Sequence, residues 1–392
     1  MVDKGYTTTN KVNVNNNHKK PFVLHIITRA SWGGAQRYVY DIATDSSSYI
    51  QAVATENEGA LVDNLHSEGV TIYHLSSARR LILPNHDLKT LFDIIKLLKR
   101  VRPDIVHLHS SKMGLIGGIA CRIVGIKKII FTAHGWPYNE NRSFIILFIF
   151  KLLSLLTILC SHKIITVSKA VFDTRPFKLF SKKIIHIYLA IKEPLYKDSE
   201  KARDVILRKT TFDAKGKYFL IGIVGELTKN KGHETMLHAL QIISKKHDNA
   251  RLICIGSGDS FPELHKLSRD LNIDNLIAWI KNFQDAAIFM KAFDVVVTPS
   301  YTEALGYVPL EAGLASVSRV ASNVGGLPEI IKNNVNGLLV ERNNPEELAY
   351  AIEKLITNDE LRERLGEQAK NDLTSFTNLD EMREKIYEVY RD

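Results

Sequence analysis

The fold is decided by the stretch DVVVTPSYTEALGYVPLEAG at residues 294–313. Its first part, Asp294 to Pro299, is an apolar run closed by proline, which is typical of a buried parallel strand. Its second part places Glu303 in a loop after that strand and Glu311 inside a short helix. Open α/β sheets bind ligands at the carboxyl ends of their strands, so two carboxylates around Gly306 could hold hydroxyls and a phosphate together. The alternative is that Glu303 is a solvated loop residue and Glu311 a surface residue of the helix.

Strands and helices alternate along the chain, which predicts parallel, doubly wound sheets with right-handed crossovers. In the first half, strands are expected at residues 22–28, 52–55, 70–74, 104–109, 128–133, 163–167 and 184–188. After a charged, irregular stretch, further strands are expected at residues 218–224, 250–256, 276–279, 295–298, 318–321 and 337–340. The fold class is therefore α/β, with two Rossmann-like domains facing each other across a cleft.

The length of 392 residues suits two domains of about 200 residues better than one core. Residues 1–20 are polar and lack the apolar segment of a signal peptide, so a disordered lead is expected there. Cys121, Cys160 and Cys254 are far apart and have no metal-ligand spacing. They predict buried thiols in a reducing compartment, with no disulfide framework and no zinc site.

The net charge of +9 is concentrated in the first half of the chain. Residues 1–190 contain 25 Lys and Arg against 12 Asp and Glu, whereas residues 191–392 contain 27 against 31. A basic half can attract nucleic acid, anionic lipid or a phosphorylated substrate. An RNA-binding aromatic signature, a zinc finger and a helix-turn-helix pattern are all absent from the sequence, so nucleic acid is the weakest of the three.

Two helical stretches of the basic half raise the question of membrane contact. Residues 144–160 are apolar except for Lys151 and a few hydroxyls, but the stretch is short for a membrane span. We expect a buried core helix there, with shallow membrane contact as the alternative. The stretch 88–101 carries four basic residues and could lie on an anionic membrane, although a solvated basic face is the commoner explanation.

Glycine and lysine residues follow several of the predicted strands. Gly33 and Gly34 open a helix after the first strand, where close backbone approach and the helix dipole favour an anion. The sequence lacks the glycine fingerprint and the acidic residue that bind NAD. An NAD-dependent oxidoreductase is therefore supported only by the alternation of strands and helices. Lys231 begins a helix after the strand at 218–224, a position that suits a diphosphate. Taken alone, each feature is equally explained as a tight turn or a solvated side chain.

Histidines end two of the strands in the first half. His134 precedes Gly135 after the strand at 128–133 and could donate to a sugar hydroxyl or a phosphate. His107 and His109 alternate along the strand at 104–109, so they face the same side of the sheet. Their spacing is compatible with a metal, but no acidic or cysteine partner is near in the sequence. Packing or substrate lining is therefore favoured over a metal site.

Taken in order, these turns resemble the family-4 retaining glycosyltransferases of the GT-B fold (glycosyl transferases group 1). The resemblance covers residues 21–390, and its most specific part is the Glu-x7-Glu block from Glu303 to Glu311. Its other parts are Gly33-Gly34, the Thr-x-His-Gly turn at His134, GELTKNKG at residues 225–232, NVGGLPE at residues 323–329 and NGLLV at residues 336–340.

The resemblance implies a domain organisation. Residues 21–190 would form an N-terminal Rossmann-like acceptor domain, and residues 218–375 a C-terminal Rossmann-like nucleotide-sugar donor domain. Between them, residues 191–217 would be a linker region. Residues 376–392 would form a helix that packs back on the first domain.

The resemblance also implies roles for single residues. His134 would contact the donor sugar near the reacting carbon, Lys231 would neutralise the diphosphate leaving group, and Glu303 would hold donor sugar hydroxyls. Gly33 and Gly34 would lie against the donor diphosphate. The amides of Leu305, Gly306 and Tyr307 would be close to the sugar and the phosphates. Glu311 would bind the ribose hydroxyls.

Two positions of the donor and hinge regions depart from the family pattern. Many relatives carry Arg at the donor-binding position of Glu226, where it helps to clamp the diphosphate. Without that Arg, Glu226 either turns outward or binds the sugar or the acceptor, and Arg29 or Lys229 then supplies the positive charge for the diphosphate. Otherwise the affinity for the donor is weak. Leu189-Ala190 replaces the usual Asn-Gly after the last strand of the first domain, which removes a flexible turn.

The implied function is retaining, metal-independent hexosyl transfer from a nucleotide-diphosphate sugar, with UDP the commonest nucleotide. The acceptor would be a glycan or a lipid-linked sugar in polysaccharide or surface-glycan synthesis. In this family the departing phosphate takes the acceptor's proton, so no cofactor, metal or side-chain nucleophile is expected. We expect a cytoplasmic protein, with peripheral contact to the inner face of the membrane as an option and no nucleic acid partner. The alternatives are a nonhydrolysing nucleotide-sugar epimerase and a catalytically silent GT-B scaffold or glycan-binding protein.

Overall fold

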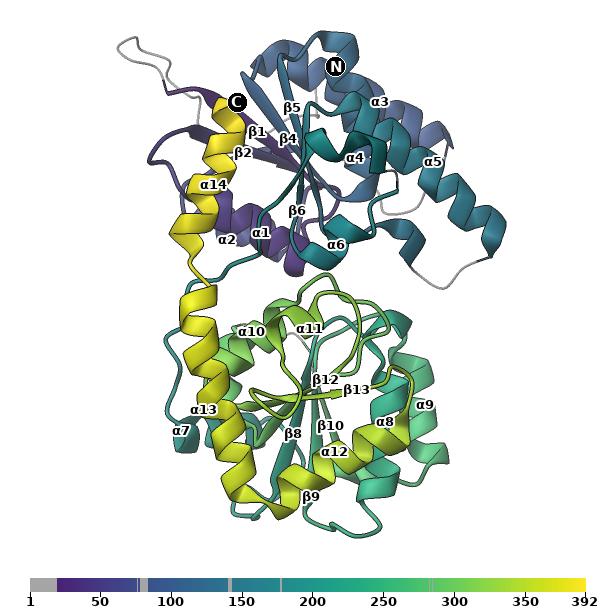
Figure 1. The fold of residues 1–392 in the computed structure, drawn as a ribbon, viewed down its shortest axis with the longest axis vertical. Coiled ribbons are helices and arrows are strands. Elements are labelled where there is room, and N and C mark those ends of the chain that lie inside the picture. The colour runs from purple at the N-terminus through teal and green to yellow at the C-terminus, as the bar shows by residue number, and fades with distance from the viewer. Residues whose placement is uncertain are drawn as a thin grey trace, which may run out of the picture. The chain divides into compact units, whose positions relative to one another are not determined.

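The computed structural model describes residues 20–75, 77, 84–139, 143–176, 178–281, 283 and 285–392. These residues form two compact units, each built on one parallel sheet (Figure 1). Unit 1 ends at Leu189 and also takes in Leu379–Asp392 from the C-terminus, and unit 2 comprises Ala190–Asn378. The predicted α/β class, with two Rossmann-like sheets and a C-terminal helix that returns to the first domain, is confirmed.

The sheet of unit 1 has seven strands in the order β3-β2-β1-β4-β5-β6-β7. These are β1 (Phe22–Ile26), β2 (Ile50–Thr55), β3 (Thr71–His74), β4 (Ile105–His109), β5 (Lys128–Ala133), β6 (Lys163–Thr166) and β7 (Ile184–His186). The α-helices are α1 (Gly34–Ala43), α2 (Ala60–Ser67), α3 (Pro84–Val101), α4 (Ser111–Val124), α5 (Phe144–Cys160), α6 (Lys169–Asp173) and α14 (Leu379–Arg391). Short 3-10 helices lie at Pro137–Asn139 and Lys178–Lys183.

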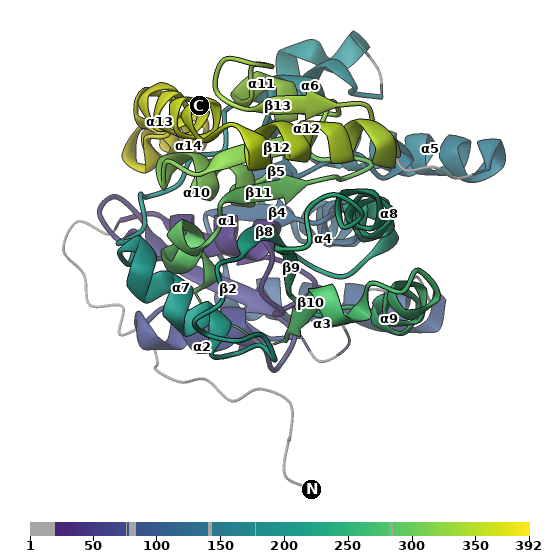
Figure 2. The ribbon, with the colours of Figure 1, turned by 90° about the horizontal axis from the view of Figure 1, so that it is seen from below.

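The strand order of unit 1 reverses between β1 and β4, which is the switch point where doubly wound sheets bind ligands. Right-handed crossovers then place α1 and α2 on one face of the sheet and α3, α4 and α5 on the other, as Figure 1 and Figure 2 show. Strand residues alternate between these faces. His25 pairs in register with His107 on the first face, and the neighbouring Leu24 and Leu108 point to the second.

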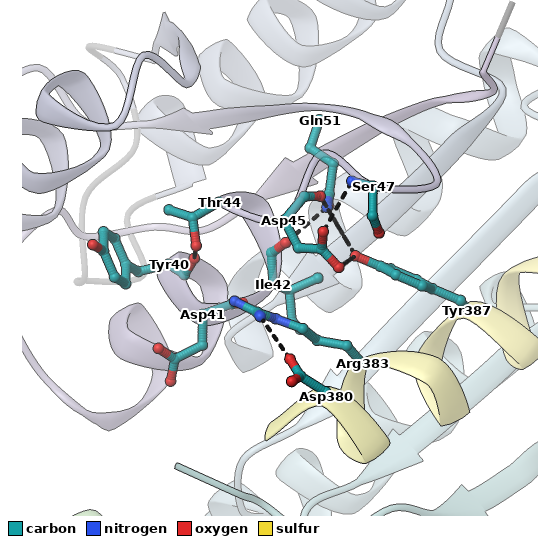
Figure 3. A network of polar contacts seen from close by, with 10 residues as sticks. All are labelled: Tyr40, Asp41, Ile42, Thr44, Asp45, Ser47, Gln51, Asp380, Arg383 and Tyr387. Carbon is teal, nitrogen blue, oxygen red and sulfur yellow. Dashed lines mark hydrogen bonds and ion pairs between the residues drawn. The ribbon is translucent and has the colours of Figure 1, made fainter. Parts of the chain in front are cut away.

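Helix α14 is fixed to α1 and β2 by the polar contacts drawn in Figure 3. Arg383 Nε donates to the carbonyl oxygen of Asp41 at 2.7 Å, and Tyr387 Oη donates to Asp45 Oδ2 at 2.8 Å. Gln51 Nε2 donates to Tyr387 Oη at 3.2 Å. These bonds make α14 part of unit 1 although it follows unit 2 in the chain.

The apolar helix α5 is not a core helix. Its buried residues are Ser154, Thr157 and Ile158, whereas Phe144 and Ile145 are 82% and 71% exposed. The expectation of a buried helix at residues 144–160 is therefore wrong, because the helix turns its hydroxyl-bearing side toward the unit. Within the part of the chain that the structure describes, no helix is both long and apolar enough to cross a membrane.

The sheet of unit 2 has six strands in the order β10-β9-β8-β11-β12-β13. These are β8 (Phe219–Val224), β9 (Ala250–Ile255), β10 (Ile277–Ile280), β11 (Val295–Thr298), β12 (Ser318–Ser322) and β13 (Leu338–Val340). The α-helices are α7 (Ser199–Leu207), α8 (His233–Ile243), α9 (Phe261–Asp270), α10 (Tyr307–Leu314), α11 (Leu327–Ile330), α12 (Pro345–Thr357) and α13 (Asp359–Phe376). Short 3-10 helices lie at Lys229–Lys231, Asp274–Leu276 and Ala286–Ala292.

Both faces of the unit 2 sheet are buried, as parallel strands require. Val295 and Val297 of β11 pack in the apolar cluster that includes α8 and α12. Val296 points the other way, into the cluster that includes α10 and α7. Helix α7 lies within the stretch 191–217, so part of the predicted linker region contributes Ala202 and Ile206 to a core.

Candidate functional site

An ion pair joins two turns at the switch point of unit 2. Strands β8 and β11 are neighbours there, and the turn after β8 carries Lys231 while the turn after β11 carries Glu303. Lys231 Nζ lies 2.6 Å from Glu303 Oε2, and the side chains are 33% and 14% exposed. Ser300 Oγ donates to the same carboxylate oxygen at 3.2 Å. The carboxylate and the ammonium are thus held together at the edge of the sheet where ligands of such folds bind.

Further hydrogen bonds fix the two turns against each other. Asn230 Nδ2 donates to the carbonyl oxygen of Thr302 at 3.0 Å, and Thr302 Oγ1 donates to Asn230 Oδ1 at 2.9 Å. The backbone amide of Tyr301 donates to the carbonyl oxygen of Asn230 at 2.8 Å. Gly232 has φ +69°, and a Cβ there would be 1.8 Å from the carbonyl oxygen of Pro299. Only glycine fits this close approach, so the two turns that carry the ion pair are packed directly against each other.

The turn after β12 supports the other side of the Glu303 loop. A Cβ on Gly325 would be 1.8 Å from the carbonyl oxygen of Glu303, and a Cβ on Gly326 would be 2.0 Å from that of Ala304. The amide of Gly326 donates to the Glu303 carbonyl oxygen at 3.1 Å. The glycine-rich turn at residues 323–329 is thus explained by backbone packing against the loop.

Helix α10 begins directly after this loop. Gly306 is its N-cap, Leu305 before it is fully buried, and Tyr307 is its first residue. The first turn of a helix directs backbone N–H groups outward and carries partial positive charge, so it favours an anion. Glu311 lies further along the same helix and is 5% exposed, which rules out the solvated surface position considered for it from the sequence.

A buried arginine holds α10 from beneath. Arg319 of β12 is 1% exposed, and its guanidinium donates to the carbonyl oxygens of Pro309 at 3.1 Å and Asn336 at 2.7 Å. Burial lowers the Arg319 pKa to about 9, and the charge of Asp372 partly offsets this. A Cβ on Gly313 would be 2.9 Å from Arg319 Nη1. Arg319 therefore ties α10 to the loop before β13.

Glu226 lies in the turn between β8 and the 3-10 helix that carries Lys231, and its side chain is exposed. The neighbouring Leu227 is buried, and its amide donates to the carbonyl oxygen of Ser257 at 3.0 Å. This exposure is compatible with an outward-turned Glu226 and equally with a Glu226 that binds the sugar or the acceptor, so its role stays a prediction. Lys229 in the same turn is also exposed.

In unit 1, helix α1 connects the predicted site residues. Gly33 is its N-cap and Gly34 its first residue. Tyr38, one turn further, meets His134 edge to face, with ring centroids 4.9 Å apart. Burial lowers the His134 pKa to about 4, so the ring is neutral at physiological pH. Its Nε2 is buried and has no hydrogen-bond partner among the described residues.

Three buried histidines lie on the sheet face that α1 and α14 cover. His25, His107 and His109 bring one ring nitrogen each to within 4.8 Å of one another, a group that could hold a metal ion. Hydrogen bonds engage most of these nitrogens, including His25 Nδ1 with His109 Nε2 at 3.1 Å. The other partners are Gln51 Oε1 for His25 at 2.7 Å, and Thr132 Oγ1 at 2.7 Å and Tyr390 Oη at 2.6 Å for His107. These bonds support the packing role that the sequence favoured.

Family profiles match both units. The profile described as Glycosyltransferase Family 4 matches residues 32–174, and the one described as Glycosyl transferases group 1 matches residues 206–372. An uncharacterized glycosyltransferase of Methanocaldococcus jannaschii is 30% identical over 278 residues, which cover 70% of this chain and 71% of that protein. The chain belongs to the family-4 glycosyltransferases of the GT-B fold.

Two further proteins are similar to this chain over nearly its whole length. The UDP-Gal:alpha-D-GlcNAc-diphosphoundecaprenol alpha-1,3-galactosyltransferase of Escherichia coli is 24% identical over 381 residues, which cover 96% of this chain and 98% of that enzyme. Among solved structures, Anabaena HepE in complex with UDP and glucose has a TM-score of 0.80 at 20% identity, covering 96% of this chain and 100% of that one. The second likeness shows the shared GT-B fold.

In this family-4 glycosyltransferase, the predicted site residues fall into two groups. Unit 2 joins Lys231 directly to Glu303 and places the start of α10 next in the chain, with Glu311 in the same helix. Unit 1 places Gly33 and Gly34 at the start of the helix whose Tyr38 meets His134.

Sequence reasoning missed the residues that hold these groups in position. Asn230 lies inside the GELTKNKG motif and Ser300 just before Glu303, so their positions were a usable signal. The partnership of Tyr38 with His134 and the burial of Arg319 depend on tertiary packing and have no local signal.

Proposed function

We propose that this glycosyltransferase transfers a sugar, with retention of the anomeric configuration, from a UDP-sugar to a hydroxyl of a glycan or lipid-linked acceptor. The bond from the anomeric carbon to the diphosphate oxygen breaks, and UDP leaves with the electron pair. The acceptor oxygen bonds to the same carbon on the same face, and its proton passes to the departing phosphate oxygen. The observation that carries this proposal is the Lys231–Glu303 ion pair at the switch point of unit 2.

The ion pair suits two parts of such a donor, its anionic diphosphate and the hydroxyls of its sugar. An ammonium has three N–H donors, and Glu303 accepts from one of them, so Lys231 can also donate to diphosphate oxygens. Lys231 then stabilises the charge that develops on the leaving group. The Glu303 carboxylate, an acceptor with several lone pairs, can take hydrogen bonds from donor sugar hydroxyls as well.

The remaining donor contacts follow from the family pattern and the local geometry. We assign the amides of Leu305, Gly306 and Tyr307 to the sugar and phosphates, because they begin α10. The buried Glu311 takes the ribose hydroxyls. No metal is needed in this scheme, since the lysine and the helix terminus supply the positive field.

In unit 1 we assign the diphosphate to Gly33 and Gly34 and the donor sugar to His134. The ring of His134 is neutral, so it can donate or accept one hydrogen bond without placing a second cation near the reacting carbon. The exposed Glu226 is kept apart from the diphosphate in this scheme.

For the biological setting we propose polysaccharide or surface-glycan synthesis in the cytoplasm, at the inner face of the membrane. The support is the Escherichia coli relative, whose name gives a UDP-sugar donor and a diphosphoundecaprenol-linked acceptor.

The test is transfer from a panel of UDP-sugars, beginning with UDP-galactose, to GlcNAc-diphosphoundecaprenol, with the product's anomeric configuration read by NMR. An α-linked product from an α-linked donor, formed equally in EDTA, is expected. An epimerised donor with an unmodified acceptor would favour the epimerase instead, and absence of UDP binding by calorimetry would favour a silent scaffold.

A further inference from the structure

Helix α5 carries an apolar surface that the rest of unit 1 does not cover. We propose that this surface docks on an anionic lipid bilayer, with α5 lying in the plane of the membrane and its outward side chains at the boundary of headgroups and acyl chains. The proposal deepens the membrane setting proposed above by naming the surface that makes the contact, and its evidence comes from unit 1 and not from the transfer site.

The orientation of α5 is the reverse of that in an ordinary surface helix. Surface helices turn apolar residues inward and polar residues outward. In α5 the buried face includes Ser154 and Thr157. Their hydroxyls donate within the helix, to the carbonyl oxygens of Phe150 at 2.8 Å and Leu153 at 3.1 Å, so burying them leaves no polar group unpaired. The hydroxyl groups on the inward side of α5 therefore have hydrogen-bond partners, and the large apolar side chains face outward.

The outward residues form one continuous stripe. Large apolar side chains recur at steps of three and four along the helix, which places them on one side. Those that are exposed are Phe144, Ile145, Ile146, Phe148, Ile149, Leu152, Leu156 and Leu159. Together they expose on the order of several hundred Å² of apolar surface, comparable to the largest patches on soluble monomers, which often mark interaction sites.

Glycines of α4 hold α5 rigidly in this orientation. A Cβ on Gly114 would be 2.8 Å from Thr157 Cγ2, and a Cβ on Gly118 would be 2.9 Å from Cys160 Cβ. The two helices are thus packed at a distance that only glycine allows, in the way that small residues bring membrane helices together. The stripe belongs to a firmly packed helix.

The sequence that contains and follows α5 is basic, which favours an anionic partner. From residue 143 to residue 183 the single acidic residue of the sequence is Asp173. The basic residues of the same stretch are Lys151, Lys163, Lys169, Arg175, Lys178, Lys182 and Lys183, of which Lys163 forms an ion pair with Asp392 at 3.4 Å. Lys183 Nζ donates to the carbonyl oxygen of Ser161, next to the end of α5, at 3.3 Å. Lysines beside an apolar face are typical of helices that bind anionic lipid surfaces.

The length of α5 fits a helix that lies on the membrane. Its 17 residues span about 25 Å at 1.5 Å per residue, which is less than the ~30 Å hydrocarbon core of a bilayer. One side of the helix is also occupied by α4. Insertion to the depth of the outward side chains is the arrangement that buries the stripe.

The experiment is co-sedimentation of the full chain with vesicles of equal parts phosphatidylglycerol and phosphatidylcholine, compared with phosphatidylcholine alone. Binding to the anionic vesicles is expected. It should fall at least about tenfold in the triple variant Ile149→Ser, Leu152→Ser, Leu156→Ser, and it should weaken in Lys151→Glu. Phe148→Trp should add fluorescence that brominated lipid quenches.

The matched control removes three exposed large apolar side chains from unit 2, in the variant Leu195→Ser, Val335→Ser, Tyr350→Ser. It should bind vesicles as the parent does. Equal melting temperatures of both triple variants and the parent exclude misfolding, and hydrolysis of UDP-sugar in solution reports the transfer site separately. The proposal is overturned if the α5 variant binds vesicles like the parent. It is also overturned if light scattering shows a dimer that this variant dissociates while the parent binds no vesicles.

Discussion

Lys231 Nζ and Glu303 Oε2 are 2.6 Å apart, and this contact links the turns that follow the two adjacent strands at the switch point of unit 2. Each side chain therefore orients the other. A lysine that reaches a diphosphate from this position keeps one N–H on Glu303, and a glutamate that binds sugar hydroxyls keeps one oxygen on Lys231. The two residues should act as one unit in the reaction.

Replacing either residue tests this coupling. Lys231→Ala is expected to lower kcat about 10²- to 10³-fold, because it removes a charge that stabilises the leaving group in the transition state. Glu303→Gln keeps a hydrogen-bonding group but loses the charge that orients Lys231, so a similar loss is expected. The double variant should be little worse than either single one, which steady-state kinetics with a UDP-sugar would measure.

The control for these variants is Lys245, an exposed lysine of unit 2 that follows α8 and lies outside the candidate site. Lys245→Ala should keep kcat within about twofold of the parent if the ion pair is what matters. Fully additive losses in the double variant would show that the two residues work independently.

A methyl group at Gly232 should disable the site through the backbone. The Cβ would be 1.8 Å from the carbonyl oxygen of Pro299, so Gly232→Ala must push apart the turns that carry Lys231 and Glu303. Gly69 offers a matched control, because its φ of +71° is close to the +69° of Gly232 but nothing lies within 4 Å of its Cβ position. Gly69→Ala should cost about 1 kcal/mol of stability and leave activity intact. Equal activity of the two variants would contradict the role of this contact.

The sheets could be predicted from the sequence because parallel strands buried on both faces leave continuous apolar runs. Val295 to Val297 is such a run, and its neighbours along the chain follow the same pattern. The position of α5 could not be predicted this way. Its composition indicates burial, whereas its orientation depends on the glycines of α4. Composition alone does not say which side of a helix meets the protein.

The part of the site that lies in turns at strand ends could be predicted from the sequence. Lys231 and Glu303 follow recognisable strands, and parallel topology brings such turns to one edge of the sheet. Contacts between residues that are far apart in the sequence could not be predicted. His25 pairs with His107 through the register of β1 and β4, and His107 meets Tyr390, from the far end of the chain, only through tertiary packing.

Arg319 should be a structural residue whose loss is costly. Arg319→Met would leave the carbonyl oxygens of Pro309 and Asn336 buried without their donor, which should lower the free energy of unfolding by about 2 to 5 kcal/mol. Urea denaturation measures this. The exposed Arg342 provides the comparison, since Arg342→Met should change stability by less than about 0.5 kcal/mol. Similar values for both variants would remove the argument that Arg319 ties down α10.

Protonation of buried histidines should destabilise the protein in mild acid, and His233 gives the cleanest test. Burial, with a smaller contribution from Lys231, lowers its pKa from 6.5 to about 4. Between these values the unfolded chain binds a proton that the folded chain does not, so the free energy of unfolding falls as pH decreases from 6.5 toward 4. The slope for one such group is about 1.4 kcal/mol per pH unit.

His233→Leu should remove this part of the pH dependence. Both ring nitrogens of His233 are buried without hydrogen-bond partners among the described residues, so leucine loses no bond that the imidazole makes there. Urea unfolding at several pH values between 4.5 and 7 should show a shallower decline for His233→Leu than for the parent. The exposed His66 is the control, and His66→Gln should follow the parent curve. A parallel decline in His233→Leu and the parent would mean that His233 takes up its proton in the folded protein as readily as in the unfolded chain.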